Sequence, residues 1–180
     1  MKRAYSYLLR GLAFIHFFAV GNYILYAQAS DNATLNVALS DVRSIMVNPT
    51  QNTVELVFAT PEDYQNGVTS SQSYHIMVTS TGGFQITVKA STEGLTNGAY
   101  TIPVNTIGLH PGPSAKGSIL LAIVYYDLNL SSARQPVIES PGGCHLCAFD
   151  VVYHAKGGDP YIGKPAGTYV ATITYSIEPN

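Results

Sequence analysis

Two cysteines, Cys144 and Cys147, are the residues whose types and spacing most directly suggest chemistry. A Cys-x-x-Cys motif can form a local disulfide, remain as two free thiols, supply thiolates to a metal site or act as a redox pair. Zinc takes four ligands, and the chain has no second such motif, although His145 or His154 could add a ligand. Redox pairs begin helices, whereas Gly142-Gly143 precede this motif and a predicted strand follows it. We predict a local disulfide between Cys144 and Cys147, with the other three roles as alternatives, and we expect no metal or other cofactor.

The remaining reactive side chains form no catalytic pattern. The chain contains no Gly-x-Ser-x-Gly, His-Glu-x-x-His or phosphate-binding glycine motif. His75, His110 and His154 are scattered over predicted strands and loops, which is typical of polar surface or half-buried residues. The acidic residues include no recognisable facing pair of the kind that glycoside hydrolysis requires. The sequence therefore predicts no enzymatic activity.

The first 29 residues have the pattern of a secretory signal peptide. Three basic residues open the chain, an apolar stretch follows at residues 12–20, and Ala27-Gln28-Ala29 offers small residues at the positions that a signal peptidase reads. Gly21-Asn22 interrupts the apolar run, which is then short of the ~20 residues needed to span a bilayer. We expect residues 1–29 to be removed, residues 30–180 to form one domain without a membrane span, and the mature protein to be periplasmic, secreted or surface-exposed.

Charge is scarce in this chain. Charged residues make up 11% of the sequence, against about 25% in an average soluble protein. Removal of 29 residues, three of them basic and none acidic, leaves six basic and eleven acidic residues, a net charge of −5. Such a chain offers no surface that would neutralise phosphates, so nucleic acid is excluded as a partner.

The mature chain alternates apolar and polar residues with the period of two that is typical of strands. About eight short strands at this spacing predict an all-β fold, a single immunoglobulin-like β-sandwich of antiparallel strands. Residues 61–67 predict a loop. The expected strands lie at residues 35–39, 45–47, 54–58, 74–78, 84–88, 100–104, 119–126, 149–153 and 169–177.

Local features refine this pattern. Gly82-Gly83 is typical of a hairpin turn and would pair residues 74–78 with residues 84–88. Asn97-Gly98 marks a second turn, and Pro103 in the strand after it indicates a strand end or an edge position. The continuous apolar run at residues 119–126 predicts a central strand that is covered on both faces.

Tyrosine is abundant, at 13 residues, and tryptophan is absent. Exposed tyrosines can stack on sugar rings, whereas tyrosines in strands commonly pack in the core or against neighbouring strands. A carbohydrate- or cell-wall-binding module is therefore the alternative function, with a surface glycan as its ligand. The aromatic residues that would face it are Tyr125, Tyr126, Tyr153 and Tyr161.

The segment KPAGTYVATITY at residues 164–175 resembles the final strand of bacterial surface β-sandwich proteins of the spore coat U and fimbrial-subunit type. The segments NTVELVFATPEDYQNGV, STGGFQITVKA and LTNGAYTIPV are similar to exported β proteins of Bacteroidetes-type bacteria. The resemblance implies an immunoglobulin-like domain that serves as a secreted or surface structural subunit, fimbrial or adhesin-like, without catalysis.

Fimbrial subunits of this type are joined by strands donated from one subunit to the next. The resemblance implies a donor segment that contains Leu35, Val37 and Leu39, with like subunits or a periplasmic chaperone as partners. Pro179 departs from the pattern because an aromatic residue is usual there, and the cysteines are closer than in such subunits. The alternative is a self-complete sandwich whose first and last strands are its own edges. The C-terminal residues expected to take part in strand exchange are Gly167, Tyr169, Ile173 and Tyr175.

Overall fold

The computed structural model describes residues 29–114 and 122–180. Within this range, Leu39–Asn180 form one compact unit, and residues 29–38, which form no helix or strand, belong to a separate unit. The predicted signal peptide lies outside the described residues except for its last position.

In the described part of the compact unit, the regular structure is mostly antiparallel strands, with one short α-helix and two single-turn 3-10 helices. Many elements are short, as expected for a chain with frequent glycine and proline turns. In chain order the elements are β1 (Arg43–Val47), η1 (Pro49–Gln51), α2 (Pro61–Asn66), β2 (Val68–Ser80), β3 (Phe84–Ala90), β4 (Gly94–Asn97), β5 (Tyr100–Pro103), η2 (Val104–Thr106), β6 (Ile107–Pro113), β7 (Val124–Tyr125), β8 (Leu128–Asn129), β9 (Gln135–Ser140), β10 (Cys144–Ala155) and β11 (Ile173–Pro179).

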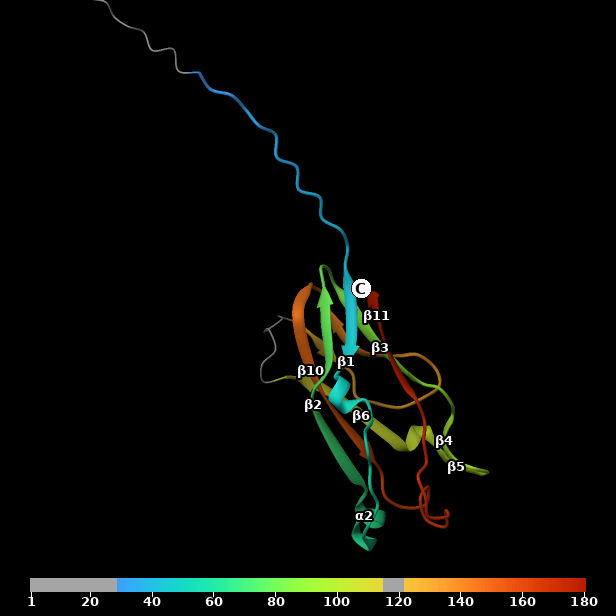
Figure 1. The fold of residues 1–180 in the computed structure, drawn as a ribbon. Coiled ribbons are helices and arrows are strands. Elements are labelled where there is room, and N and C mark those ends of the chain that lie inside the picture. The colour runs from blue at the N-terminus through green and yellow to red at the C-terminus, as the bar shows by residue number, and fades with distance from the viewer. Residues whose placement is uncertain (1–28, 115–121) are drawn as a thin grey trace, which may run out of the picture. The chain divides into compact units, whose positions relative to one another are not determined.

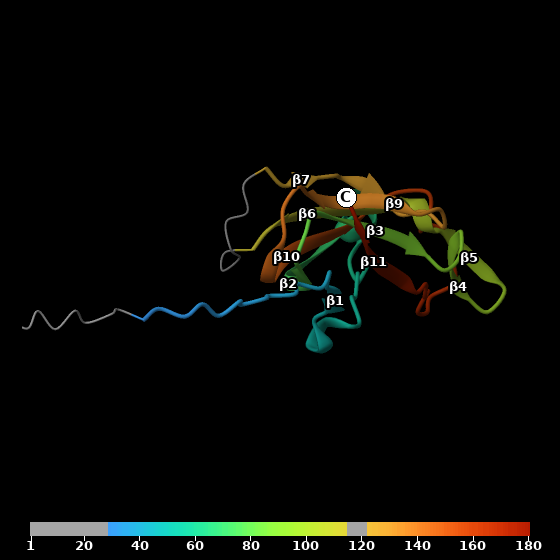
Figure 2. The same ribbon diagram turned by 90° about the horizontal axis from the view of Figure 1, so that it is seen from above.

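Two sheets form the layers of the sandwich (Figures 1 and 2). The first, called sheet A, has the strand order β1-β2-β10-β6-β8, and the second, sheet B, has the order β11-β3-β9-β7. Strands β4 and β5 form a separate hairpin. The prediction of an all-β sandwich is therefore confirmed, with eleven strands in the described residues.

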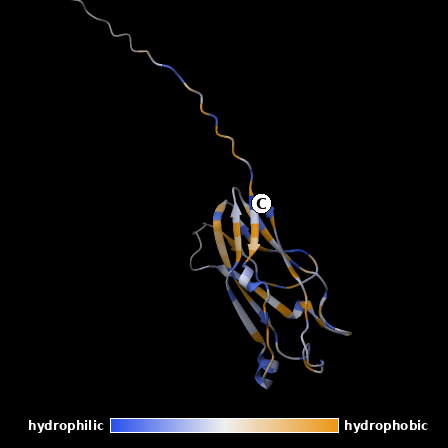
Figure 3. Cartoon of the chain, in the orientation of Figure 1, coloured by the Kyte–Doolittle hydropathy of each residue, from blue (hydrophilic) through white to orange (hydrophobic). Residues whose placement is uncertain are grey.

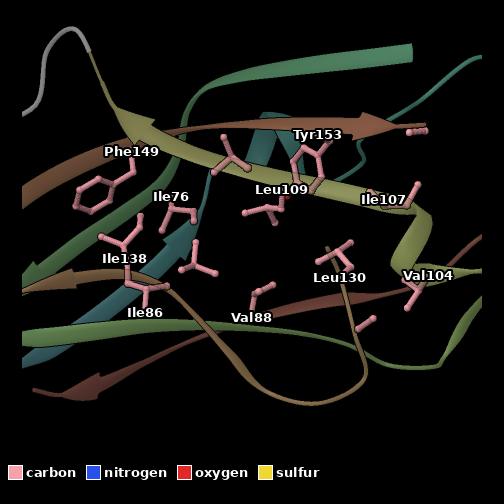
Figure 4. Close-up of a cluster of buried hydrophobic side chains, with 14 of the residues drawn as sticks. Ile76, Ile86, Val88, Val104, Ile107, Leu109, Leu130, Ile138, Phe149 and Tyr153 are labelled. Carbon is pink, nitrogen blue, oxygen red and sulfur yellow. The ribbon is translucent and has the colours of Figure 1, made fainter. Parts of the chain in front are cut away.

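The core lies between the inner faces of sheets A and B. Ile76 and Leu109 of sheet A and Phe84 and Ile86 of sheet B are fully buried, and Figure 4 shows several of these side chains directed into the space between the two layers. The rings of Phe84 and Phe149 join the sheets with centroids 6.5 Å apart. Burial of each large apolar side chain contributes about 1.5–3 kcal/mol, so this interlayer cluster is the main source of stability.

The alternating apolar segment at residues 35–39 does not form a strand, so this prediction is wrong in the structure. Its alternation is visible in the hydropathy colouring of Figure 3. A strand requires a partner that pairs its backbone groups, and no described strand pairs with these residues.

The predicted hairpin at Gly82-Gly83 is also wrong. Strands β2 and β3 do follow one another there, but β2 belongs to sheet A and β3 to sheet B. Both edges of β2 from Ile76 to Ser80 are already occupied, by β1 on one side and β10 on the other. The glycine turn therefore carries the chain from one layer to the other.

Within residues 61–67, where a loop was predicted, Pro61–Asn66 form the helix α2 and Gly67 is its C-cap. Thr60 and Asp63 make a capping box, in which the Asp63 carboxylate accepts from the Thr60 backbone N–H at 2.8 Å and the Thr60 hydroxyl accepts from the Asp63 N–H. Pro61 occupies the first turn, where its missing N–H has no cost. These reciprocal bonds start the helix α2 in a segment too short to show helical periodicity.

Two further strand predictions need correction. Residues 54–58 are extended and alternate as expected, with Val54, Leu56 and Phe58 packed against the core, but they pair with neither sheet. In the run 119–126, residues 119–121 lie outside the described residues, and the described part forms the two-residue strand β7 at the edge of sheet B, not a central strand. The hairpin turn at Asn97-Gly98 is confirmed.

Candidate functional sites

A polar recess lies on the outer face of sheet A, across strands β10, β6 and β8. Gly108 of β6 pairs in register with His154 of β10 on one side and with Asn129 of β8 on the other. An open surface hollow of about 240 Å³ lies beside these residues. We call this hollow the Gly108 recess; its lining residues are Gly108, His110, Asp127, Leu128, Asn129, His154 and Lys156.

An imidazole and a carboxylate are coupled at one side of this recess. His110 Nδ1 lies 3.2 Å from Asp127 Oδ1, within the distance of an ion pair when the imidazole is protonated. A Cβ placed on Gly108 would be 3.4 Å from His110 Nε2 and 3.7 Å from Asn129 Oδ1. The recess therefore gathers the imidazole, carboxylate and carboxamide groups with the Lys156 ammonium around one small volume, a mixture of donors and acceptors suited to hydroxyl groups.

Sequence reasoning interpreted His110 and His154 only as scattered polar residues and did not identify this recess. Gly108-x-His110 and Asp127-x-Asn129 alternate with buried apolar residues, which is the pattern of an outward face. That signal could have placed the four residues on an outer surface. It could not have placed them together, because the register between β6, β8 and β10 joins segments far apart in the chain.

A buried polar chain connects the two sheets elsewhere in the molecule. Gln51 Oε1 can only accept, so His75 Nδ1 donates to it at 3.2 Å and Nε2 accepts from the Tyr153 hydroxyl at 2.9 Å. The Tyr175 hydroxyl of β11 then donates to the Tyr153 hydroxyl at 2.7 Å. Burial lowers the pKa of His75 and raises the pKa of Tyr153 to about 12. All members are satisfied, and the chain is a structural link, not an exposed reactive site.

The four tyrosines proposed to face a ligand do not gather in one exposed platform. Tyr153 and Tyr161 retain only 2% and 9% of their exposed surface, and the Tyr161 hydroxyl donates to Thr106 Oγ1 at 2.8 Å. Tyr125 packs edge-on against the Phe149 ring of the core, with centroids 6.3 Å apart. Tyr126 is half-buried and donates to Glu139 Oε2 at 2.8 Å. The rings of Tyr153 and Tyr161 are therefore core elements that cannot stack on a ligand in this structure.

The two cysteines lie at the start of β10. Both are free thiols in the structure, Cys144 half-buried and Cys147 buried. Burial, together with the adjacent Cys144, raises the pKa of the Cys147 thiol to about 12. The structure thus brings the pair together, and the disulfide between them stays a prediction.

The residues proposed for strand exchange fall into three groups. Leu35, Val37 and Leu39 expose 87%, 75% and 91% of their surface. Ile173 and Tyr175 lie in β11 and pack against the core. Gly167 and Tyr169 precede that strand; Gly167 has a φ of +150°, and a Cβ there would collide with the side chain of Asn97 in the β4–β5 turn. The positive φ therefore favours glycine at position 167, and a larger residue would also displace the Asn97 side chain.

In the part of the chain that the structure describes, no three His, Cys, Asp or Glu side chains are grouped so that they could hold a metal ion. Nor does any described helix have the length and apolarity to cross a membrane. Neither models of known protein families nor curated protein sequences match this chain.

Proposed function

We propose that this protein is an exported structural subunit of the cell surface, fimbrial in type and without catalytic activity, that joins like subunits by strand addition. The observation that carries the proposal is the exposure of Leu35, Val37 and Leu39. Three apolar side chains on alternate positions match one face of a strand, and large exposed apolar surface commonly marks an interaction site. The signal-peptide pattern supports export.

The accepting surface in this proposal is the edge of β11 that does not pair with β3. Strand β11 has seven residues and lies at one end of the strand order of sheet B, where β3 is its partner within the described chain. The edge strands β7 and β8, by contrast, have two residues each and offer little backbone for pairing. An edge strand of this length presents unpaired N–H and C=O groups to which an extended segment can add.

Sedimentation of the mature chain, residues 30–180, tests this proposal against a chain that begins at Ser40. We expect concentration-dependent assembly of the mature chain and a monomer for the truncated one, since the truncation removes all three donor side chains. A synthetic peptide of residues 31–41 should add to the truncated chain and raise its unfolding temperature.

A peptide in which Leu35, Val37 and Leu39 are replaced by Asn is the matched control, and it should have no effect. The proposal fails if the mature chain remains monomeric and neither peptide changes the unfolding temperature. A donor that requires a chaperone for exchange would still show the peptide effect, so the two measurements distinguish slow assembly from the absence of strand addition.

The Gly108 recess supports a second candidate function, the binding of a saccharide. Vicinal hydroxyl groups both donate and accept, and the recess is lined by the His110 imidazole, the Asp127 carboxylate and the donor Lys156. Among the described residues that line it there is no Phe, Tyr or Trp, so the expected binding is weak.

Gly108→Val tests this second function because it fills the recess without backbone strain, as Gly108 has no positive φ. Gly112→Val is the matched control: Gly112 lies on the same strand and the same outer face, and a Cβ there would meet no atom within 4 Å. Chemical-shift titration with glucose, galactose, mannose and N-acetylglucosamine should move the signals of His110 and Asn129 in the wild type and in Gly112→Val, but not in Gly108→Val. Equal responses of all three proteins, or none in any, would eliminate the recess as a saccharide site.

A further inference from the structure

The start of β10 contains an irregularity that changes where the two cysteines point. Cys144 pairs with Ser80 of β2, and Cys147 pairs with Val78. Three steps along β10 thus match two steps along β2, which is the geometry of a β-bulge with one extra residue. In a regular strand, residues three apart point to opposite faces of the sheet. The bulge instead places both cysteines opposite Ser80 and Val78, two residues that are themselves buried on the inner face.

The backbone holds this bulge at some cost. Leu146 has a φ of +52°, a left-handed conformation that costs a non-glycine residue on the order of 1 kcal/mol. Its side chain is 69% exposed, so core packing does not explain the conformation. The Leu146 N–H donates to Thr79 Oγ1 at 3.2 Å. On the other side of the motif, a Cβ on Gly143 would lie 2.5 Å from the Ser80 carbonyl oxygen, so only glycine allows this approach.

The bulge places the two cysteines next to each other on the same face of the sheet, opposite Val78 and Ser80. Cys144 Sγ donates to the Val78 carbonyl at 3.7 Å, and the neighbouring Cys144 contributes, after burial, to the raised pKa of Cys147. Their surroundings differ, because Cys147 retains 1% of its exposed surface whereas Cys144 is half-buried. A reagent from solution can therefore approach Cys144 and not Cys147.

We propose that Cys144 and Cys147 form a directional dithiol site, at which an external disulfide reacts first with Cys144 and the bulge then delivers Cys147 to close an intramolecular disulfide. This inference is independent of strand addition and of saccharide binding. It assigns the entering and the resolving thiol, a distinction that the spacing of the motif does not contain.

The chemistry balances with a small disulfide as the oxidant. The Cys144 thiolate attacks one sulfur of the reagent, forms a mixed disulfide and releases one thiol. Cys147 then loses its proton and attacks Cys144 Sγ, which forms the protein disulfide and releases the second thiol. The protein loses two electrons and two protons, and the reagent becomes two thiols. Burial and the neighbouring Cys144 raise the pKa of Cys147, so little of its thiolate forms. The second step therefore requires Cys144 Sγ to lie next to Cys147, which the bulge provides.

Oxidised glutathione is the probe for a test with the reduced mature chain under native conditions, followed by intact mass. The wild type should lose two hydrogen atoms without a lasting glutathione adduct. Cys147→Ser should accumulate one glutathione on Cys144. Cys144→Ser should react with oxidised glutathione at least about tenfold more slowly than Cys147→Ser, because its remaining thiol is buried and shielded. In denaturant the two single variants should react at similar rates, which controls for intrinsic reactivity.

A second measurement avoids variants that could fold poorly. Limiting iodoacetamide applied to the reduced wild type, followed by peptide mapping, should modify Cys144 before Cys147. The proposal is overturned if Cys147 is modified first or at the same rate, or if glutathione oxidises the wild type to intermolecular dimers in place of the internal disulfide.

Discussion

The inner and outer faces of β6 and β10 are made from alternate residues of the same two segments, yet their environments are opposite. On the inner face, Leu109 and Val151 are fully buried and Tyr153 is 2% exposed. On the outer face, His110 is exposed and His154 is half-buried beside the glycine of the recess. The same backbone ladder fixes both sets, because each residue on one face is bracketed by residues of the other.

The inner residues therefore provide the stability of the sandwich, whereas the outer residues provide its polar binding groups. Inner residues are held by packing between sheets A and B, where a change in volume creates a cavity or a clash. Outer residues are positioned by that same packing without contributing to it, so their identities can vary at little cost. The sandwich therefore acts as a rigid support for the Gly108 recess.

The largest expected difference between the faces is between Leu109→Ala and His110→Ala. Loss of the Leu109 side chain leaves a cavity in the core and should lower the free energy of unfolding by about 2–5 kcal/mol. His110→Ala removes an exposed side chain and should change it by no more than about 0.5 kcal/mol. Chemical denaturation of the two variants measures both values; similar losses would contradict the division between the faces.

The pattern of alternation predicted the faces well because it follows directly from the pleat. Residues 54–58 are a clear case, since Val54, Leu56 and Phe58 face the core even though the segment joins no sheet. Pairing partners were harder to predict. The turn at Gly82-Gly83 has the same local sequence character whether it closes a hairpin or carries the chain between layers, and only the occupied edges of β2 decide between these outcomes.

The sites were less predictable than the faces. The Cys144–Cys147 pair was identified from its spacing, but the bulge was not, because leucine is an unfavourable residue for the left-handed conformation that Leu146 adopts. The Gly108 recess depends on a register among three strands, and the absence of a side chain at Gly108 has meaning only once its neighbours are known.

Tyr153→Phe tests the inner face in a second way, because it removes a buried hydroxyl and leaves the shape of the ring unchanged. The hydroxyl donates to His75 Nε2 and accepts from Tyr175, so its loss leaves two buried groups without these partners. We expect the free energy of unfolding to fall by about 1–3 kcal/mol. Tyr169→Phe is the control, since its hydroxyl makes an exposed bond to Pro165 O; thermal denaturation should show almost no change for that variant.

The buried His75 should also make stability depend on pH. Burial lowers the pKa of His75 below its usual 6.5, so the unfolded state binds more protons than the folded state in the acidic range. Stability should therefore be full above pH 6.5 and decrease as the pH falls below it. In His75→Gln this part of the decrease should disappear from denaturation curves recorded between pH 7 and pH 5, and His110→Gln should retain it.

The smallest expected effect concerns two glycines on the outer face of β6. Gly108→Val and Gly112→Val both place a β-branched side chain on a strand whose backbone accepts it, and neither position has a positive φ. Each variant should change the free energy of unfolding by no more than about 0.5 kcal/mol. If Gly108→Val instead destabilises the protein by as much as Leu109→Ala, the recess is part of the packed structure, and the separation between a supporting inner face and a variable outer face does not hold at this point of the sheet.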